Sequence, residues 1–296
     1  MFFPLNESIS QTKKERQMNK WTVITRSIIV LLMMQIILGA LSALLLLLLP
    51  PDAAPEEWIN DFNIYFSLYG SLFNLITILI LNFYVENKSW KSLGWMTSSA
   101  VKKHSRIIGA AVLILLTLIG INILTGFMRM EWNENFHAVF FLLTVLGFFI
   151  QAVSQEFIFR GYIMNGLSVD GRILQGIWIN SLFLALIFIV NSQLSLFGSL
   201  NILLFSGVLS YIFYFTSNIK LTILLNAATQ IIIGPLLGSN FQGQDIPHSL
   251  LISYLESSQE RVPMDQDILF TIVLLIIAAF LHFKLYRNQS EEIETR

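Results

Sequence analysis

Hydrophobic and polar positions follow one another along this chain in long blocks rather than in a residue-by-residue alternation. About eight blocks are apolar and long enough, or nearly so, to cross a membrane as α-helices, since a span needs about 20 apolar residues. We expect these spans at 21–49, 63–84, 107–127, from 136 to beyond 155, and at 173–190, 200–215, 221–237 and 268–283. The pattern therefore predicts an all-α, polytopic membrane helix bundle.

The polar segments between the blocks divide the chain into parts. We expect a basic head over 1–20, two N-terminal spans over 21–85, a connector over 86–106, a six-span core over 107–286 and a tail over 287–296. Within the polar stretch 239–266, the residues near 250–255 are expected to form a short interfacial helix.

Composition supports the membrane assignment and excludes several kinds of chemistry. The chain is 55% hydrophobic and only 12% charged, whereas a soluble protein carries about 25% charged residues. A lipid bilayer is therefore its expected surrounding. The absence of cysteine excludes disulfides, thiolate metal sites and a cysteine nucleophile. The net charge of −1 gives no indication of nucleic acid binding.

The distribution of Lys and Arg predicts an orientation. If eight spans place both termini on one side, only Arg129 and Arg261 of the 18 basic residues fall on the other side. Because cytoplasmic loops carry the excess of Lys and Arg, we expect a multi-pass protein of the cell membrane with both termini in the cytoplasm.

The fourth block carries an unusual pair of charges, Glu156 and Arg160, among Phe, Ile and Val residues. Ionisable groups within membrane segments are costly and mark candidate functional sites. A simpler interpretation is a helical ion pair between positions i and i+4 that is neutralised near the lipid headgroups. Twenty helical steps from Phe136 cover roughly 30 Å, which places Glu156 near the far face of the membrane.

Several short motifs carry a resemblance to a known family. The run from Glu156 to Gly161 resembles the first motif, Glu-Glu-x-x-x-Arg, of the CAAX protease and bacteriocin-processing (CPBP/Abi) family of intramembrane proteases. Further similarities, covering about residues 85–235, are Ser92-Leu93-Gly94-Trp95, Asn180-Ser181, the segment from Leu204 to Gly207, and Leu224-Leu225-Asn226-Ala227.

The resemblance implies a water held by paired glutamates and histidines, with a metal, but this sequence departs from the family at those positions. Gln155 occupies the position of the first Glu, and Ile187 or Phe188 occupies the position at which the second motif has His. The third motif, His-x-x-x-Asn, becomes Asn226 to Gln230. One carboxylate without imidazole makes a poor metal site. We therefore expect no cofactor, and zinc only if the protein is an active enzyme.

These departures leave three functions open. The first is a pseudoprotease that binds or regulates a membrane or cell-envelope partner protein, which is what similarity to the degenerate, lysostaphin-resistance-A-like bacterial members implies. The second is an active intramembrane endopeptidase with an unusual site built on Glu156. The third is a small transporter, although no paired halves with broken helices are evident. We also expect Glu156 to face the bundle interior, within hydrogen-bond reach of Arg160 or of polar groups such as Asn180 and Asn226.

Overall fold

A computed structural model describes residues 5–15, 20–47, 56–95, 100–191, 196–239, 245–246, 248–256, 260–263 and 267–294. Parts of the expected basic head, connector and outer polar stretch lie outside these residues. The α-helices are α1 (Glu7–Glu15), α2 (Lys20–Leu47), α3 (Glu56–Ile80), α4 (Ala100–Leu124), α5 (Ala138–Glu156), α6 (Asn165–Ser168), α7 (Ile173–Asn191), α8 (Leu196–Thr216), α9 (Ile219–Ile231) and α10 (Ile268–Glu294).

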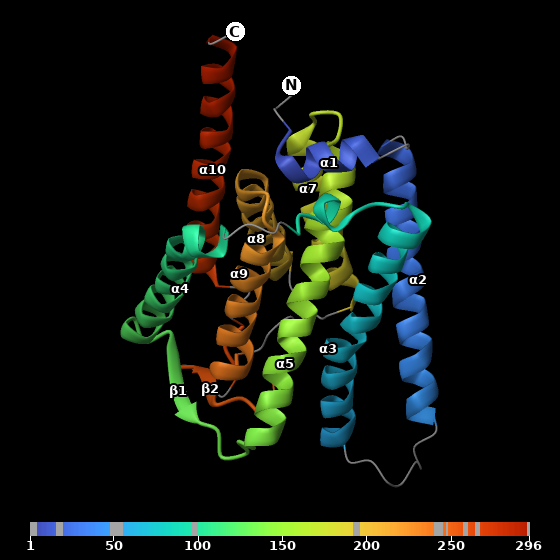
Figure 1. The fold of residues 1–296 in the computed structure, drawn as a ribbon. Coiled ribbons are helices and arrows are strands. Elements are labelled where there is room, and N and C mark those ends of the chain that lie inside the picture. The colour runs from blue at the N-terminus through green and yellow to red at the C-terminus, as the bar shows by residue number, and fades with distance from the viewer. Residues whose placement is uncertain are drawn as a thin grey trace.

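The helical membrane architecture is confirmed. In the part of the chain that the structure describes, six helical segments are long and apolar enough to cross a membrane. Two shorter apolar helices, Ile28–Leu44 and Ile173–Ile189, occupy the two remaining predicted positions. Helices dominate because lipid offers no hydrogen-bonding partners, so a spanning backbone must bond within itself. Both ends of the chain lie at the same end of the bundle (Figure 1).

The prediction of an interfacial helix near residues 250–255 is wrong. These residues form strand β2 (Leu251–Leu255), which pairs antiparallel with β1 (Met128–Trp132) at the end of the bundle opposite to the termini (Figure 1). The register places Met128 opposite Leu255. Each strand satisfies the backbone groups of the other, and their separation in sequence explains why local patterning did not reveal the pair.

A short helix within the expected basic head, α1, packs across the terminal end of the bundle. Asn6 begins it, since its side-chain oxygen accepts a hydrogen bond from the Ile9 amide at 2.8 Å. Ile9 is fully buried. The Ser8 and Thr12 hydroxyls donate to the Ser92 carbonyl at 3.3 and 3.0 Å. The helix α1 of the head is therefore part of the folded core at this end.

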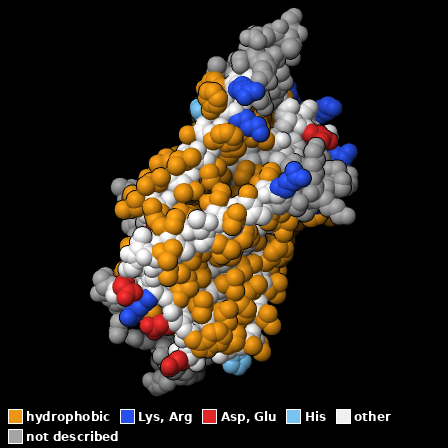
Figure 2. Space-filling model, turned by 90° about the vertical axis from the view of Figure 1, so that its left-hand side faces the viewer, with side chains coloured by type: hydrophobic (Ala, Val, Ile, Leu, Met, Phe, Trp, Pro, Cys, Tyr) orange, Lys and Arg blue, Asp and Glu red, His pale blue; other side chains and the backbone are white. Residues whose placement is uncertain are grey.

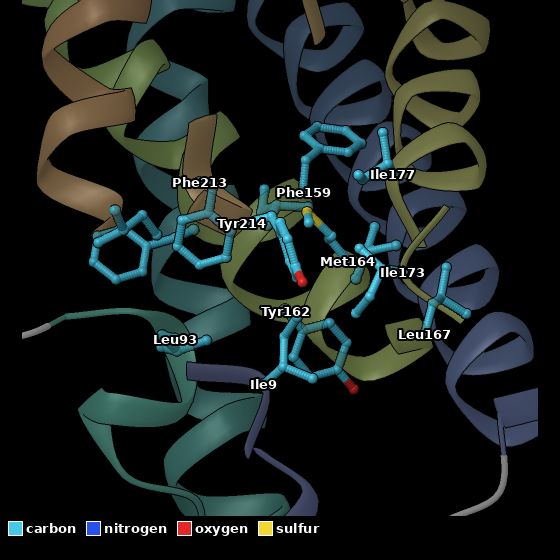
Figure 3. Close-up of a cluster of buried hydrophobic side chains, with 14 of the residues drawn as sticks. Ile9, Leu93, Phe159, Tyr162, Met164, Leu167, Ile173, Ile177, Phe213 and Tyr214 are labelled. Atoms are coloured by element: carbon cyan, nitrogen blue, oxygen red, sulfur yellow. The ribbon is translucent and has the colours of Figure 1, made fainter. Parts of the chain in front are cut away.

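The main hydrophobic cluster lies beneath α1, around a π-helical turn that continues α5, η3 (Phe157–Met164). Every residue of this turn is buried. Side chains from η3, the start of α7 and the end of α8 meet there with Ile9 and with Leu93 of the 3₁₀ turn η2 (Trp90–Leu93) (Figure 3). This packing fixes the position of η3, which carries Arg160 and directly follows Glu156.

Glu86 joins three elements at the same end of the bundle. It follows the π-helical turn η1 (Leu81–Val85) and pairs with Lys88 and with Arg26 of α2, the latter at 2.9 Å. Its Oε1 also accepts a hydrogen bond from the Tyr162 hydroxyl at 2.6 Å. Burial alone would raise the pKa of Glu86, but Lys88, Tyr162 and Arg26 together hold it below its usual value.

We expect the cluster around Glu86 to make the folded protein less stable at acid pH. A carboxyl group with a depressed folded-state pKa contributes stability above its unfolded pKa of about 4.3, and this stability is lost as pH falls through the folded value. Melting temperatures measured between pH 7 and pH 3.5 should fall more for the wild type than for Glu86→Gln. Parallel curves for the two proteins would contradict this prediction.

Candidate functional site

The charged motif lies inside a continuous helical segment and not at its end. The backbone passes from α5 through η3 and α6, so that one apolar helical segment extends from Ala138 to Ser168. Glu156 is the last α-helical residue before the π-helical turn and is fully buried. The expected pairing of Glu156 and Arg160 at positions i and i+4 occurs inside the bundle, where protein encloses both side chains. Single π-helical turns within α-helices are frequent at functional sites.

Glu156 and Arg160 form a buried ion pair. Arg160 Nη1 donates to Glu156 Oε1 at 3.0 Å, and both side chains have 0% exposure. Arg160 Nη2 donates to the carbonyl and to the hydroxyl of Ser206, each at 2.9 Å. Arg160 thus connects η3 to α8. The rule that predicts membrane orientation counts Lys and Arg residues in loops. Arg160 is buried in the bundle and should therefore be left out of that count.

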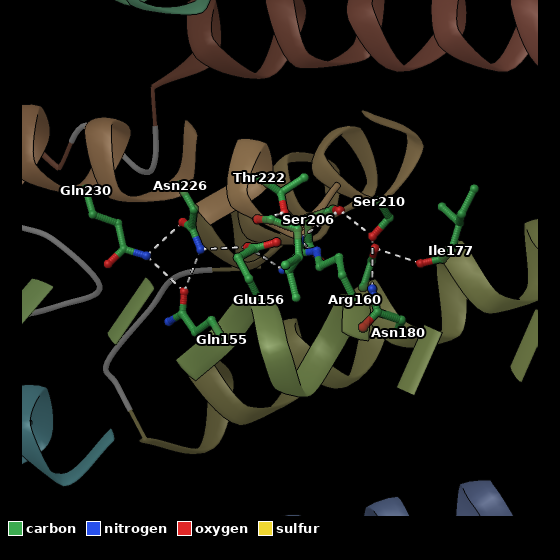
Figure 4. A network of polar contacts seen from close by, with 12 residues as sticks. Gln155, Glu156, Arg160, Ile177, Asn180, Ser206, Ser210, Thr222, Asn226 and Gln230 are labelled. Carbon is green, nitrogen blue, oxygen red and sulfur yellow. Dashed lines mark hydrogen bonds and ion pairs between the residues drawn. The ribbon is translucent and has the colours of Figure 1, made fainter. Parts of the chain in front are cut away.

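Amide side chains extend the network from Glu156 toward α9. Asn226 Nδ2 donates to Glu156 Oε1 at 2.9 Å and to Gln155 Oε1 at 3.1 Å. Gln230 Nε2 donates to Gln155 Oε1 at 2.9 Å and to Asn226 Oδ1 at 2.8 Å. The structure therefore brings all five candidate residues into one connected set: Gln155, Glu156, Arg160, Asn226 and Gln230 (Figure 4).

Two serines of α8 belong to the network but were not among the candidates. The Ser206 carbonyl accepts hydrogen bonds from Arg160 and, at 2.8 Å, from the Ser210 hydroxyl. Asn180 of α7 donates to Ser210 at 2.9 Å and does not contact Glu156. The spacing of Ser206 and Ser210, four residues apart in an apolar helix, was the available signal, because such serines often join helices inside membranes.

The side chains at this site do not fit a zinc ion. No three His, Cys, Asp or Glu side chains gather anywhere in the described residues. Glu156 supplies the only carboxylate of the network, and its Oε1 already accepts from Arg160 and Asn226. Catalytic zinc normally has three protein ligands from nitrogen, carboxylate or thiolate groups. The amides of Gln155, Asn226 and Gln230 do not replace these ligands.

Three of the four histidines have other surroundings. His282 of α10 bonds the Tyr211 hydroxyl at 2.7 Å. His248 bonds Asp61 at 3.3 Å near the opposite end of the bundle. His137 precedes the first residue of α5. Ile187 and Phe188, the two alternatives for the missing histidine of the second motif, line a cleft beside Gln155.

This cleft, which we call the amide cleft, has a volume of about 400 Å³ and lies between α2, α3, α5 and α7. The described residues of its walls are apolar or uncharged polar ones, with no charged residue among them. The buried oxygens Asn74 Oδ1 and Gln151 Oε1 have no hydrogen-bond partner among the described residues. The polar lining comprises Gln35, Ser42, Asn63, Ser67, Ser71, Asn74, Gln151, Ser154 and Gln155.

Comparison with known proteins identifies one family. A family model described as type II CAAX prenyl endopeptidase Rce1-like matches residues 136–232. No curated protein and no solved structure matches the chain. The matched region runs from the start of α5 to the end of α9 and contains every residue of the network. Residues 136–232 are thus similar to the Rce1-like family, and this match confirms the CPBP resemblance noted in the sequence.

Proposed function

We propose that this protein is a non-catalytic member of the CPBP family that binds or regulates a membrane or cell-envelope partner protein. The observation that carries the proposal is the connected network at the family motifs. There, Gln155, Asn226 and Gln230 bond to one another and to the Glu156–Arg160 pair. Hydrogen bonds between buried polar groups contribute to the stability of the fold, although Glu156 Oε2, Arg160 Nε and Gln230 Oε1 have no partner among the described residues.

The chemistry of peptide hydrolysis supports the same conclusion. Hydrolysis requires a base for the attacking water, and a metal-dependent route also requires ligands that hold the ion. General acid–base assistance alone contributes typically ~10²–10⁴-fold. Glu156 is the only carboxylate in the network, and it accepts hydrogen bonds from the Arg160 guanidinium and the Asn226 amide. Neither Ile187 nor Phe188 supplies an imidazole.

The amide cleft supplies a binding surface for the partner. Uncharged donors and acceptors within apolar walls match a transmembrane segment that carries Ser, Thr, Asn or Gln, because such groups bond between helices inside membranes. A charged segment would be left without a counter-ion in this cleft and would bind unfavourably. The unbonded oxygens of Asn74 and Gln151 would gain partners on binding.

Photo-crosslinking in cells tests this proposal. A photoreactive amino acid at Ser67, which is exposed in the cleft, should give a discrete protein adduct. The same group at Leu72, which is 44% exposed on α3 but does not line the cleft, is the matched control and should not.

The double variant Asn74→Leu/Gln151→Leu should reduce the Ser67 adduct if the cleft amides recognise the partner. Melting temperature and expression level verify that this variant is folded. Equal adducts from positions 67 and 72, or an adduct unaffected by the double variant, would contradict the proposed binding surface.

A further inference from the structure

A second concave surface lies on a different side of the bundle, between α4, α8, α9 and α10. This crevice, which we call the apolar crevice, has a volume of about 470 Å³. Its lining is hydrophobic except for Thr229 and Arg106. The face that carries α4 and α10 is largely hydrophobic, with Lys and Arg side chains gathered toward one end (Figure 2). The crevice shares no lining residue with the amide cleft.

Two basic residues mark the same end of the apolar crevice. Arg106, exposed near the start of α4, is part of its lining. Lys284 of α10 follows Phe280 and Leu281, which also line the crevice, by four and three residues and therefore projects from the same face of the helix. Its ammonium lies 5.1 Å from the ring of Phe215, three residues beyond Ile212 of the lining.

Within the described residues, neither cation is neutralised by an acidic neighbour. Neither Arg106 nor Lys284 forms a salt bridge with any residue in the described ranges. Among the described residues that line the crevice there is no Asp or Glu. A hydrophobic slot that ends at two unpaired cations is complementary to an amphiphile with a negative head and an apolar chain.

We propose that the apolar crevice binds an anionic phospholipid, with one acyl chain between α4 and α10 and the phosphate at Arg106 and Lys284. The dimensions agree with this occupant. The lining of α4 extends from Arg106 to Leu118, twelve helical steps or roughly 18 Å. This length is close to half of the roughly 30 Å hydrocarbon thickness, the depth of a single leaflet.

The position of the cations also selects the leaflet. Arg106 begins a candidate membrane span whose other end leads into β1, and Lys284 lies three residues before the end of another, Ile268–Arg287. Because β1 lies at the end of the bundle opposite to the termini (Figure 1), both cations belong to the terminal half of their spans. The acyl chain therefore belongs to the leaflet on the terminal side. This site is independent of the proposed partner-binding function, because it uses other helices and another ligand.

Native mass spectrometry of the purified full chain tests the proposal. The protein is released from nanodiscs that contain phosphatidylglycerol and phosphatidylcholine with identical acyl chains. The wild type should retain phosphatidylglycerol preferentially. Because a basic residue near an anionic headgroup strengthens binding about five-fold, Arg106→Gln/Lys284→Gln should reduce the preference by about 25-fold.

Two further variants separate the crevice from general surface charge. Lys91→Gln/Arg172→Gln removes two cations that do not line the crevice and should leave the preference unchanged. Ala110→Phe places a ring in the crevice, where Ala110 is exposed, and should abolish retention of both lipids. Unchanged melting temperatures verify the fold of each variant. Equal retention of the two lipids by the wild type would overturn the proposal, as would undiminished phosphatidylglycerol in either crevice variant.

Discussion

Replacing Arg160 with Met is expected to lower the free energy of unfolding by about 3–5 kcal/mol, because it leaves a buried carboxylate without its cation. Glu156 has no exposed surface, so water does not compensate for the loss. The Ser206 hydroxyl also loses the hydrogen bond from Arg160, and the Ser206 carbonyl keeps only the one from the Ser210 hydroxyl. Thermal unfolding in detergent, followed by intrinsic fluorescence, measures the effect.

Two controls distinguish loss of the ion pair from loss of side-chain packing. Glu156→Gln/Arg160→Met removes both charges but keeps an acceptor for Asn226, and should recover at least half of the lost stability. Arg129→Met breaks a pair that is 40% and 54% exposed, so it should cost about 1 kcal/mol or less. If Arg160→Met were no more destabilising than Arg129→Met, the buried pair would not have the structural role described.

Replacing Gly94 with Ala is expected to destabilise the fold by about 2–5 kcal/mol. Gly94 has φ +80°, a left-handed conformation that costs other residues about 1–2 kcal/mol. An added Cβ would also lie 2.5 Å from Cε2 of Phe213 in the main core, and overpacking adds about 1–3 kcal/mol. The Gly94 carbonyl accepts the Ile219 amide at 3.1 Å, so distortion at Gly94 reaches the start of α9.

Gly120→Ala serves as the matched control in the same unfolding assay. An added Cβ at this glycine of α4 meets no atom within 4 Å. Alanine is the better helix former by about 1 kcal/mol, so stability should stay unchanged or rise slightly. Similar losses for the two substitutions would show that the tight turn at Gly94 is not the cause.

The positions of the helices were predictable from the sequence because the membrane restricts the choice of structure. A block of about 20 apolar residues must form a helix in lipid, so composition alone located α4, α5 and α10. The strands β1 and β2 were not predictable, since their pairing joins segments more than a hundred residues apart. The helix α1 was missed for a similar reason, because its buried face depends on contacts with Ser92 and Asn165.

The residues of the candidate site were also predictable only in part. Motif spacing identified Gln155, Glu156, Arg160, Asn226 and Gln230, and the structure joins these five through hydrogen bonds. Sequence spacing within one helix places Glu156 beside Arg160, but it does not reveal which residue of another helix faces them. For that reason Ser206 was missed, and Asn180, expected near Glu156, bonds Ser210 instead.

Metal analysis of the purified protein distinguishes a structural polar network from a metalloprotease site. The protein should be produced in zinc-supplemented medium, purified without chelator and analysed by inductively coupled plasma mass spectrometry beside Glu156→Gln. The proposed structural role of the network predicts zinc far below one ion per chain and equal in the two proteins, because the site offers one carboxylate and no imidazole. One zinc ion per chain in the wild type, lost in Glu156→Gln, would contradict the account and indicate an active metalloprotease.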